Sequence, residues 1–236
     1  MTQNGVHANN RIVIPIRDNI PTRSFPIITV SLVVVNTAVF VYAAFMPGWA
    51  EKGFVLKYGL VPREFLLSLH HHPELVPYNV LTIFTSMFLH GGFFHLGGNM
   101  LYLWIFGNNI EDSTGHLRFL FFYGLSGVAA ALLQLMYDPL SGIPMIGASG
   151  AISGVLGAYL LLFPYARVKT LIFIFIFITT VDLPAIVLLT IWFLIQILFS
   201  HTEGVAWSAH IGGFLFGLAS IKLFTIGRPR IRAPRR

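Results

Sequence analysis

Six apolar stretches, each long enough to cross the hydrocarbon core of a bilayer as a helix, constrain this chain more than any other feature. Such a crossing needs about 17–25 largely apolar residues. Only 10% of the residues are charged, 56% are hydrophobic and the mean hydropathy is +0.76. The pattern predicts an all-α polytopic membrane protein, a bundle of six transmembrane helices. The predicted spans are residues 27–45, 80–106, 119–137, 146–163, 183–199 and 205–221.

The intensely apolar run 171–178 is not expected to add a seventh span. Eight residues are too few to cross the membrane as a helix. Thr179, Thr180, Asp182 and Pro184 interrupt the apolar pattern directly afterwards. We therefore expect an interfacial or protein-buried approach to the fifth helix.

The basic residues favour an orientation with both termini in the cytoplasm. With six spans and the N-terminus inside, only Lys52, Lys57 and Arg63 of the 15 lysines and arginines lie outside. This asymmetry follows the positive-inside rule, whereas seven spans would export the arginine-rich tail. We expect a multi-pass integral protein of a prokaryotic plasma membrane.

The pattern divides the chain into a cytoplasmic arm (1–26), a membrane domain (27–223) and a basic cytoplasmic tail (224–236). The arm is polar and lacks the apolar core of a signal peptide, so we expect it to be loose and the first span to serve as the insertion signal. Because the tail follows directly on a membrane helix, its expected partner is the anionic lipid surface of the bilayer rather than nucleic acid. The absence of cysteine excludes disulfides and thiol catalysis.

Two polar residues stand at the heads of apolar segments. Ser149 lies in a Gly-Ala-Ser-Gly run and His210 in an Ala-His-Ile-Gly-Gly run. Polar groups at membrane depth face a protein interior or a wet cavity. Small residues at helical spacing let two membrane helices approach closely, so we expect Ser149 and His210 to meet. These small residues are Gly150, Gly154 and Gly157 after Ser149, and Gly213 and Gly217 after His210.

The pair suggests a nucleophile and its base. Serine is a weak nucleophile until a base takes its proton, and a neutral imidazole accepts a proton near neutral pH. A carboxylate to orient the imidazole is missing from any obvious place, because Asp138 and Glu203 are predicted in loops and Asp182 is distant in sequence. The residues therefore predict a Ser–His dyad.

His95 and Asn99 in the second span are spaced i, i+4, which puts both side chains on one helical face. Together with the backbone N–H of Ser149 they would supply three donors to an oxyanion. The alternative is that they only tie helices together, as polar membrane residues often do. Beside Ser149 and His210 the oxyanion interpretation is favoured.

The ordered set of motifs resembles the rhomboid intramembrane serine proteases, from about residue 25 to residue 223. The motifs are His95-x-x-x-Asn99, Gly147-Ala148-Ser149-Gly150 and Ala209-His210-x-x-Gly213-x-x-x-Gly217, with Glu111-x-x-x-Gly115-x-x-x-Phe119 and a long first external loop (46–77). The resemblance implies peptide-bond hydrolysis in transmembrane protein substrates, without a metal or other cofactor. It also implies that Ser149 is the nucleophile and His210 the general base. The oxyanion donors would be His95, Asn99 and the Ser149 amide, and Gly147 would shape the turn before the nucleophile.

One position departs from the pattern of many relatives, which carry an aromatic residue one turn after the nucleophile where this chain has Ser153. A hydroxymethyl group cannot stack on the base. We therefore expect other contacts to orient His210, with Trp207 or an aromatic of the second span as candidates, or a looser base and slower turnover.

Other functions are weaker interpretations. A catalytically inactive rhomboid-like protein that binds membrane clients is the main alternative, and the presence of both Ser149 and His210 argues against it. Metalloprotease and aspartyl motifs are absent, and no internal repeat indicates a transporter. The run His70-His71-His72 is not expected to bind a metal, since no partner at ligand spacing accompanies it. The oligomeric state is left open.

Three further expectations concern the acidic pair after the second span and the surroundings of the site. Glu111 and Asp112 are expected to make structural contacts with Arg118 or with loop amides rather than to act in catalysis. The fourth span should start deep in the membrane, so that water reaches Ser149 from outside. Substrate entry should require movement of the fifth span or of the loop that caps the site.

Overall fold

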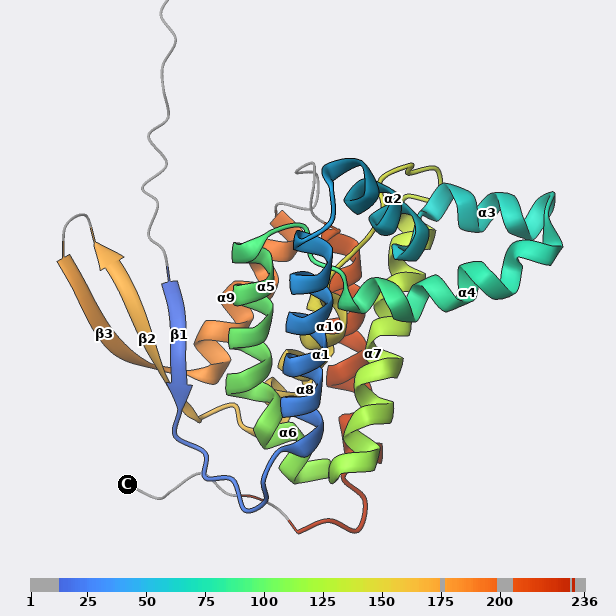
Figure 1. The fold of residues 1–236 in the computed structure, drawn as a ribbon. Coiled ribbons are helices and arrows are strands. Elements are labelled where there is room, and N and C mark those ends of the chain that lie inside the picture. The colour runs from blue at the N-terminus through green and yellow to red at the C-terminus, as the bar shows by residue number, and fades with distance from the viewer. Residues whose placement is uncertain (1–12, 175–176, 199–205, 230, 232–236) are drawn as a thin grey trace, which may run out of the picture.

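The computed structural model describes residues 13–174, 177–198, 206–229 and 231, and most of them lie in helices (Figure 1). A small sheet flanks the helical bundle. The elements in chain order are β1 (Val13–Asp18), α1 (Ile27–Ala44), α2 (Gly48–Tyr58), α3 (Pro62–His70), η1 (Pro73–Leu75), α4 (Val76–Thr85), η2 (Ser86–Phe88), α5 (Phe93–Tyr102), η3 (Leu103–Gly107), α6 (Asn108–Thr114), α7 (His116–Tyr137), α8 (Ser149–Leu162), β2 (Arg167–Ile174), β3 (Phe177–Pro184), α9 (Ala185–Leu198) and α10 (Trp207–Phe224).

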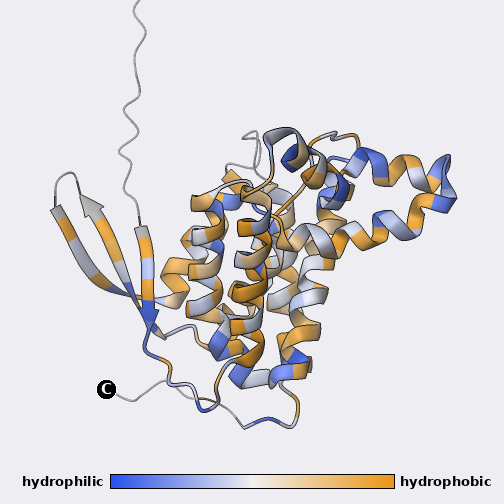
Figure 2. Cartoon of the chain, viewed as in Figure 1, coloured by the Kyte–Doolittle hydropathy of each residue, from blue (hydrophilic) through white to orange (hydrophobic). Residues whose placement is uncertain are grey.

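The bundle confirms the expected class, a polytopic helical membrane protein. Within the described residues, α1, α7 and α10 are long and apolar enough to cross a bilayer, and α8 and α9 are shorter apolar helices of 14 residues each. Apolar residues cover much of the outer faces of the bundle, and hydrophilic ones gather at the tip of the α3–α4 arm (Figure 2). The apolar residues of the outer faces include Val34 and Leu132, whose side chains are exposed and suit a lipid environment. The count of six spans stays a prediction.

The second span is not the single helix expected over residues 80–106. The segments Pro73–Phe88 and Phe93–Thr114 meet at an angle of 85°. The 3-10 turn η2 ends at Phe88, the next residue Leu89 is extended, and Gly91 and Gly92 follow. Two adjacent glycines are poor helix formers, so the chain turns here. The α3–α4 arm consequently projects sideways from the bundle, while α5 and α6 run along it (Figure 1).

The three-stranded antiparallel sheet, in the order β1-β2-β3, is a feature that the sequence did not predict. The run 171–178, expected as an interfacial or protein-buried approach to the fifth helix, lies in β2 and β3, and β3 leads directly into α9. Residues 175–176 of the run lie outside the described part. Its β-branched and aromatic residues favour strands. The sheet leads from α8 to α9 and stands beside the bundle (Figure 1).

The expectation of a loose arm over residues 1–26 is wrong from Val13 onwards. Val13–Asp18 pairs with β2, and Asn109 Nδ2 donates a 2.6 Å hydrogen bond to the Asp18 carboxylate. The Tyr159 hydroxyl of α8 donates to the same carboxylate oxygen. Long-range hydrogen bonds to α6 and α8 therefore hold this segment against the bundle.

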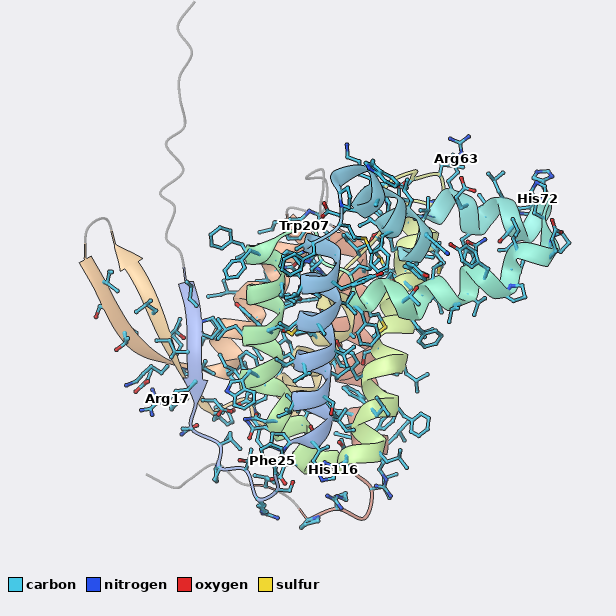
Figure 3. All side chains as sticks on the ribbon, viewed as in Figure 1. Arg17, Phe25, Arg63, His72, His116 and Trp207 are labelled. Atoms are coloured by element: carbon cyan, nitrogen blue, oxygen red, sulfur yellow. The ribbon has the colours of Figure 1, made fainter. Side chains whose placement is uncertain are left out.

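Trp207 and His116 lie at opposite ends of the bundle, named here the Trp207 end and the His116 end (Figure 3). At the His116 end, the fully buried Glu111 accepts hydrogen bonds from the backbone N–H of Ile28 at 2.9 Å and of Thr29 at 2.8 Å. These N–H groups belong to the first turn of α1 and have no partner within the helix. The carboxylate therefore caps α1 and ties it to α6.

The neighbouring carboxylate of Asp112 binds the backbone N–H groups of Arg23 and Ser24. Loop amides were one of the two kinds of partner expected for this acidic pair and they bind Asp112, whereas the helix amides of α1 on Glu111 were not expected. Arg118 donates instead to the carbonyl oxygens of Phe224 and Ile226.

Glycines bring α8 and α10 into close contact at the centre of the bundle. A Cβ atom on Gly213 would overlap the carbonyl oxygen of Gly150, and one on Gly217 would overlap the carbonyl oxygen of Gly154. Gly157 faces the carbonyl oxygen of Phe214 in the same way. Backbone therefore touches backbone along this seam, as small residues allow between membrane helices.

Candidate active site

Ser149 is the first residue of α8. The preceding Gly147 has φ +120°, a conformation that favours glycine, and its N–H donates to the carbonyl oxygen of Ser86 at 2.9 Å. A Cβ atom on Gly147 would lie 2.7 Å from Nε2 of His95 and 3.6 Å from Oγ of Ser149. Glycine is required here both by the backbone and by the close approach of His95.

His210 lies in the first turn of α10, and its Nε2 is 2.8 Å from Oγ of Ser149. The two residues are 61 positions apart in the chain. The glycine seam between α8 and α10 begins directly beside them, because Gly150 and Gly213 touch. The structure therefore brings together the hydroxyl and the imidazole as their sequence surroundings indicated.

His95 and Asn99 lie on α5 and face the same cavity as Ser149 and His210. The N–H of Gly91 approaches Nδ1 of His95 at 3.4 Å, which puts the proton of a neutral ring on Nε2. That nitrogen faces Gly147. Asn99 is buried, and one N–H of its amide donates to the carbonyl oxygen of His95 at 2.9 Å. The second N–H of the amide is left for another acceptor. Both side chains thus have a donor for an oxygen bound in the cavity.

The cavity above Ser149 has a volume of about 1240 Å³. A second cavity of about 280 Å³ lies between α5, α8 and α9, lined among others by Tyr102, Ser153 and Trp192. Both include Ser149 and His210 in their walls. The larger cavity lies at the Trp207 end, where the loop before Gly147 contributes Pro144 and Met145 to its wall. The loop therefore covers the start of α8, and the depth of that start in the membrane stays a prediction.

The imidazole of His210 contacts one expected residue, Trp207, and two that the sequence did not assign to it, Gln196 and Trp192. Its Nδ1 lies 2.8 Å from Oε1 of Gln196 on α9. The rings of Trp192 and Trp207 have centroids 6.1 Å from its own. Within the part of the chain that the structure describes, no carboxylate is hydrogen-bonded to His210.

Ser153 does not replace the aromatic contact, because its Oγ donates to the carbonyl oxygen of Ser149 at 2.6 Å. Trp207, expected as a candidate, meets the His210 ring edge-on. Gln196 is an amide on an apolar helix, and the default role of such a residue is an interhelical hydrogen bond. The one signal in the sequence is a lone amide on the apolar helix α9, and nothing local to it indicates His210.

The three histidines at the tip of α3 are not near the cavity. Nδ1 of His72 lies 3.2 Å from Oε1 of Glu74, and both side chains are exposed. Among the described residues, no group of three or more histidine or acidic side chains is placed to hold a metal ion. The absence of a metal or other cofactor stays a prediction.

The sequence matches the protein-family profile described as Rhomboid domain over residues 77–226, well over half of the chain. The chain belongs to the rhomboid family. Rhomboid protein 1, mitochondrial, of Saccharomyces cerevisiae is 34% identical to this rhomboid over 147 residues, which is 61% of the chain and 38% of that protein. RHOMBOID-like protein 1 of Arabidopsis thaliana is 28% identical over 230 residues, 87% of the chain and 55% of that protein. Rhomboid protease GluP of Bacillus subtilis is 40% identical over 78 residues, 33% of the chain and 15% of that protein.

This rhomboid thus spans only 38% and 55% of the lengths of the yeast and Arabidopsis relatives. The match from residue 77 to residue 226 contains every motif residue from His95 to Gly217. Family membership supports a function like that of an intramembrane protease.

Proposed function

We propose that this rhomboid is an intramembrane serine endopeptidase in which Ser149 and His210 form the catalytic dyad. The observation that carries the proposal is the 2.8 Å contact between Ser149 Oγ and His210 Nε2 in a cavity that also holds His95 and Asn99. A hydroxyl within hydrogen-bond reach of an imidazole is the arrangement that activates serine.

In the proposed reaction, Ser149 Oγ attacks the carbonyl carbon of the scissile peptide bond while its proton passes to Nε2 of His210. The negative charge moves to the carbonyl oxygen, which accepts hydrogen bonds from His95 Nε2–H, the Asn99 amide and the Ser149 N–H. Collapse of the tetrahedral intermediate breaks the C–N bond, and the amine leaves with the proton from His210.

The acyl-enzyme left by this step is hydrolysed by water. His210 takes one proton from the attacking water, and the new tetrahedral intermediate expels Ser149 Oγ, which takes that proton back. The carboxylic acid product leaves with the water oxygen. The proposed route for water to the ester is the large cavity at the Trp207 end, whose wall includes His95 and Asn99.

The proposed substrates are transmembrane segments of other proteins, because the site lies inside an apolar bundle. A helical peptide hides its carbonyl groups, so small or helix-breaking residues near the scissile bond should favour cleavage. We place the His116 end, with its arginines, in the cytoplasm. The similar proteins are mitochondrial, plant and Bacillus proteins, so the prokaryotic plasma membrane stays a prediction.

The test is cleavage of a single-span reporter protein in liposomes, combined with covalent labelling by a fluorophosphonate probe. The parent should cleave and be labelled, and Ser149→Ala should do neither. Ser31→Ala provides the matched control, since it removes a hydroxyl from the exposed face of α1. A parent protein that binds the reporter but neither cuts it nor reacts with the probe is instead the inactive client-binding protein.

A further inference from the structure

Gln196 is a buried amide on a helix whose other residues are apolar except for Thr190, and its side chain is only 4% exposed. Its two polar atoms point to different partners. Nε2 is 3.0 Å from the carbonyl oxygen of Trp192, and Oε1 is 2.8 Å from Nδ1 of His210. The side chain thus links the backbone of α9 to the imidazole on α10.

The contact between Gln196 and the Trp192 carbonyl fixes the direction of the hydrogen bonds from Gln196 to His210 and from His210 to Ser149. The carbonyl oxygen of Trp192 only accepts hydrogen bonds, so the NH₂ group of Gln196 must face it and the amide oxygen must face His210. That oxygen also only accepts, so Nδ1 of His210 must carry the proton. Nε2 of the neutral ring is then left with its lone pair, and it accepts the hydroxyl proton of Ser149 across 2.8 Å.

We propose that Gln196 is a positioning residue for the general base: it holds His210 in the tautomer whose Nε2 accepts the proton of Ser149. The inference rests on the proposed function and completes it, because a neutral amide takes the place that a carboxylate has in a catalytic triad. The tryptophan rings bound the imidazole sterically, but neither offers a hydrogen-bond acceptor to Nδ1.

Because Gln196 belongs to α9 and His210 to α10, the orientation of the imidazole depends on how α9 packs against α10. Phe193 stacks on Phe214 of α10 with ring centroids 4.3 Å apart, next to the Trp192 carbonyl that anchors Gln196. A displacement of α9 that separates these rings also withdraws the amide from His210. The base is therefore correctly oriented only while α9 is packed against α10.

The decisive variants are Gln196→Leu and Gln196→Glu. Loss of the group that fixes the tautomer of a catalytic histidine costs about 10⁴-fold in kcat when that group is a carboxylate. A neutral amide contributes less charge stabilisation, so for Gln196→Leu we expect kcat to fall roughly 10- to 100-fold with KM within about threefold of the parent. Gln196→Glu keeps an acceptor oxygen and should restore kcat at alkaline pH.

The pH dependence of kcat distinguishes a role of Gln196 in positioning His210 from a role in packing alone. In Gln196→Glu the acid limb of kcat should move to higher pH, since a nearby negative charge favours the imidazolium. Among the described residues, the other histidine and acidic side chains that line the cavity with His210 are His95 of α5 and Asp138. Both are unchanged in every variant, so their influence cancels in the comparison.

Two controls complete the design. Thr190→Val removes the other polar side chain of α9 from an exposed position and should leave kcat and the acid limb as in the parent. Gln134→Leu removes a buried amide of α7 that bonds to Ser208 of α10, and should lower the melting temperature without moving the acid limb. The fluorophosphonate labelling rate should fall with kcat in Gln196→Leu.

The outcomes distinguish this inference from the proposed function. An active parent whose Gln196→Leu variant keeps its kcat within about twofold, or whose Gln196→Glu variant leaves the acid limb in place, overturns the role of Gln196 alone. A parent that neither cleaves nor reacts with the probe overturns the proposed function itself. Should Gln196→Leu fail to fold, the shift of the acid limb in Gln196→Glu still decides the question.

Discussion

Gly213→Ala adds a single methyl group in the backbone contact between α8 and α10, close to the Ser149–His210 pair. The new Cβ atom would lie 3.0 Å from the carbonyl carbon of Gly150 and 3.4 Å from the nitrogen of Gly154, and it would overlap the Gly150 oxygen. These are backbone atoms, so no side chain can rotate away. Ordinary contact requires the helices to separate by about 1 Å, which is enough to cost on the order of a hundredfold in rate at an active site.

We therefore expect Gly213→Ala to lower turnover by roughly a hundredfold although no reacting group is changed. The inserted volume should also destabilise the protein by about 1–3 kcal/mol. Gly213→Leu should be worse on both counts. The measurements are reporter cleavage per folded molecule in liposomes and the thermal unfolding midpoint in detergent.

Gly124→Ala on α7 is the matched control, because a Cβ atom there has no neighbour within 4 Å. Alanine is favoured over glycine in a helix by about 1 kcal/mol, so this variant should keep its activity and melt at the same or a higher temperature. If Gly213→Ala behaves like Gly124→Ala in both measurements, the glycine seam does not set the distance between Ser149 and His210.

Three further predictions concern the site and the pH dependence of stability. Ser149→Ala and His210→Ala should each abolish nearly all cleavage with little change in melting temperature, and the double variant should be scarcely worse than either single; residual cleavage above about one per cent in Ser149→Ala contradicts its role. Asn99→Ala should lower kcat roughly ten- to a thousandfold with little effect on KM, as for one oxyanion donor among several; a lowered melting temperature with normal kcat would indicate a structural role instead. Burial raises the pKa of Asp18 from 3.8 to about 6, so the folded state keeps a proton that the unfolded state has lost between about pH 4 and 6. Stability should therefore fall by at most about 3 kcal/mol as pH rises through this window, and Asp18→Asn should remove this slope in thermal unfolding measured from pH 4 to 7.

Features that depend on neighbouring residues were predictable from the sequence. The C-terminal ends of α1, α7 and α8 were expected within one residue and their starts within three, because a membrane helix satisfies its backbone internally and needs only a long apolar run. The meeting of Ser149 and His210 was also predictable, since glycines at spacings of three and four mark one face of each helix. These inferences used patterns within single helices.

The 85° break between α4 and α5 and the pairing of β1 with β2 were not predictable in this way. The apolar run 80–106 continues through the break without a charged residue, so composition alone conceals it. The strand at Val13–Asp18 forms only because β2 offers it a partner more than 140 residues later. A strand needs hydrogen bonds from elsewhere in the chain, whereas a helix does not.

The sequence by itself determined that this chain is a polytopic membrane protein and which hydroxyl and imidazole face each other, because apolar length and glycine spacing act within single helices. The rhomboid family was indicated by the resemblance of its ordered motifs. Only the tertiary structure decided which group orients the base. Gln196 lies 14 positions before His210 on a different helix, and its role follows from the direction of two hydrogen bonds. The directions of these hydrogen bonds depend on how α9 packs against α10. A single polar residue forms no periodic pattern in the sequence, so this packing could not be predicted from it.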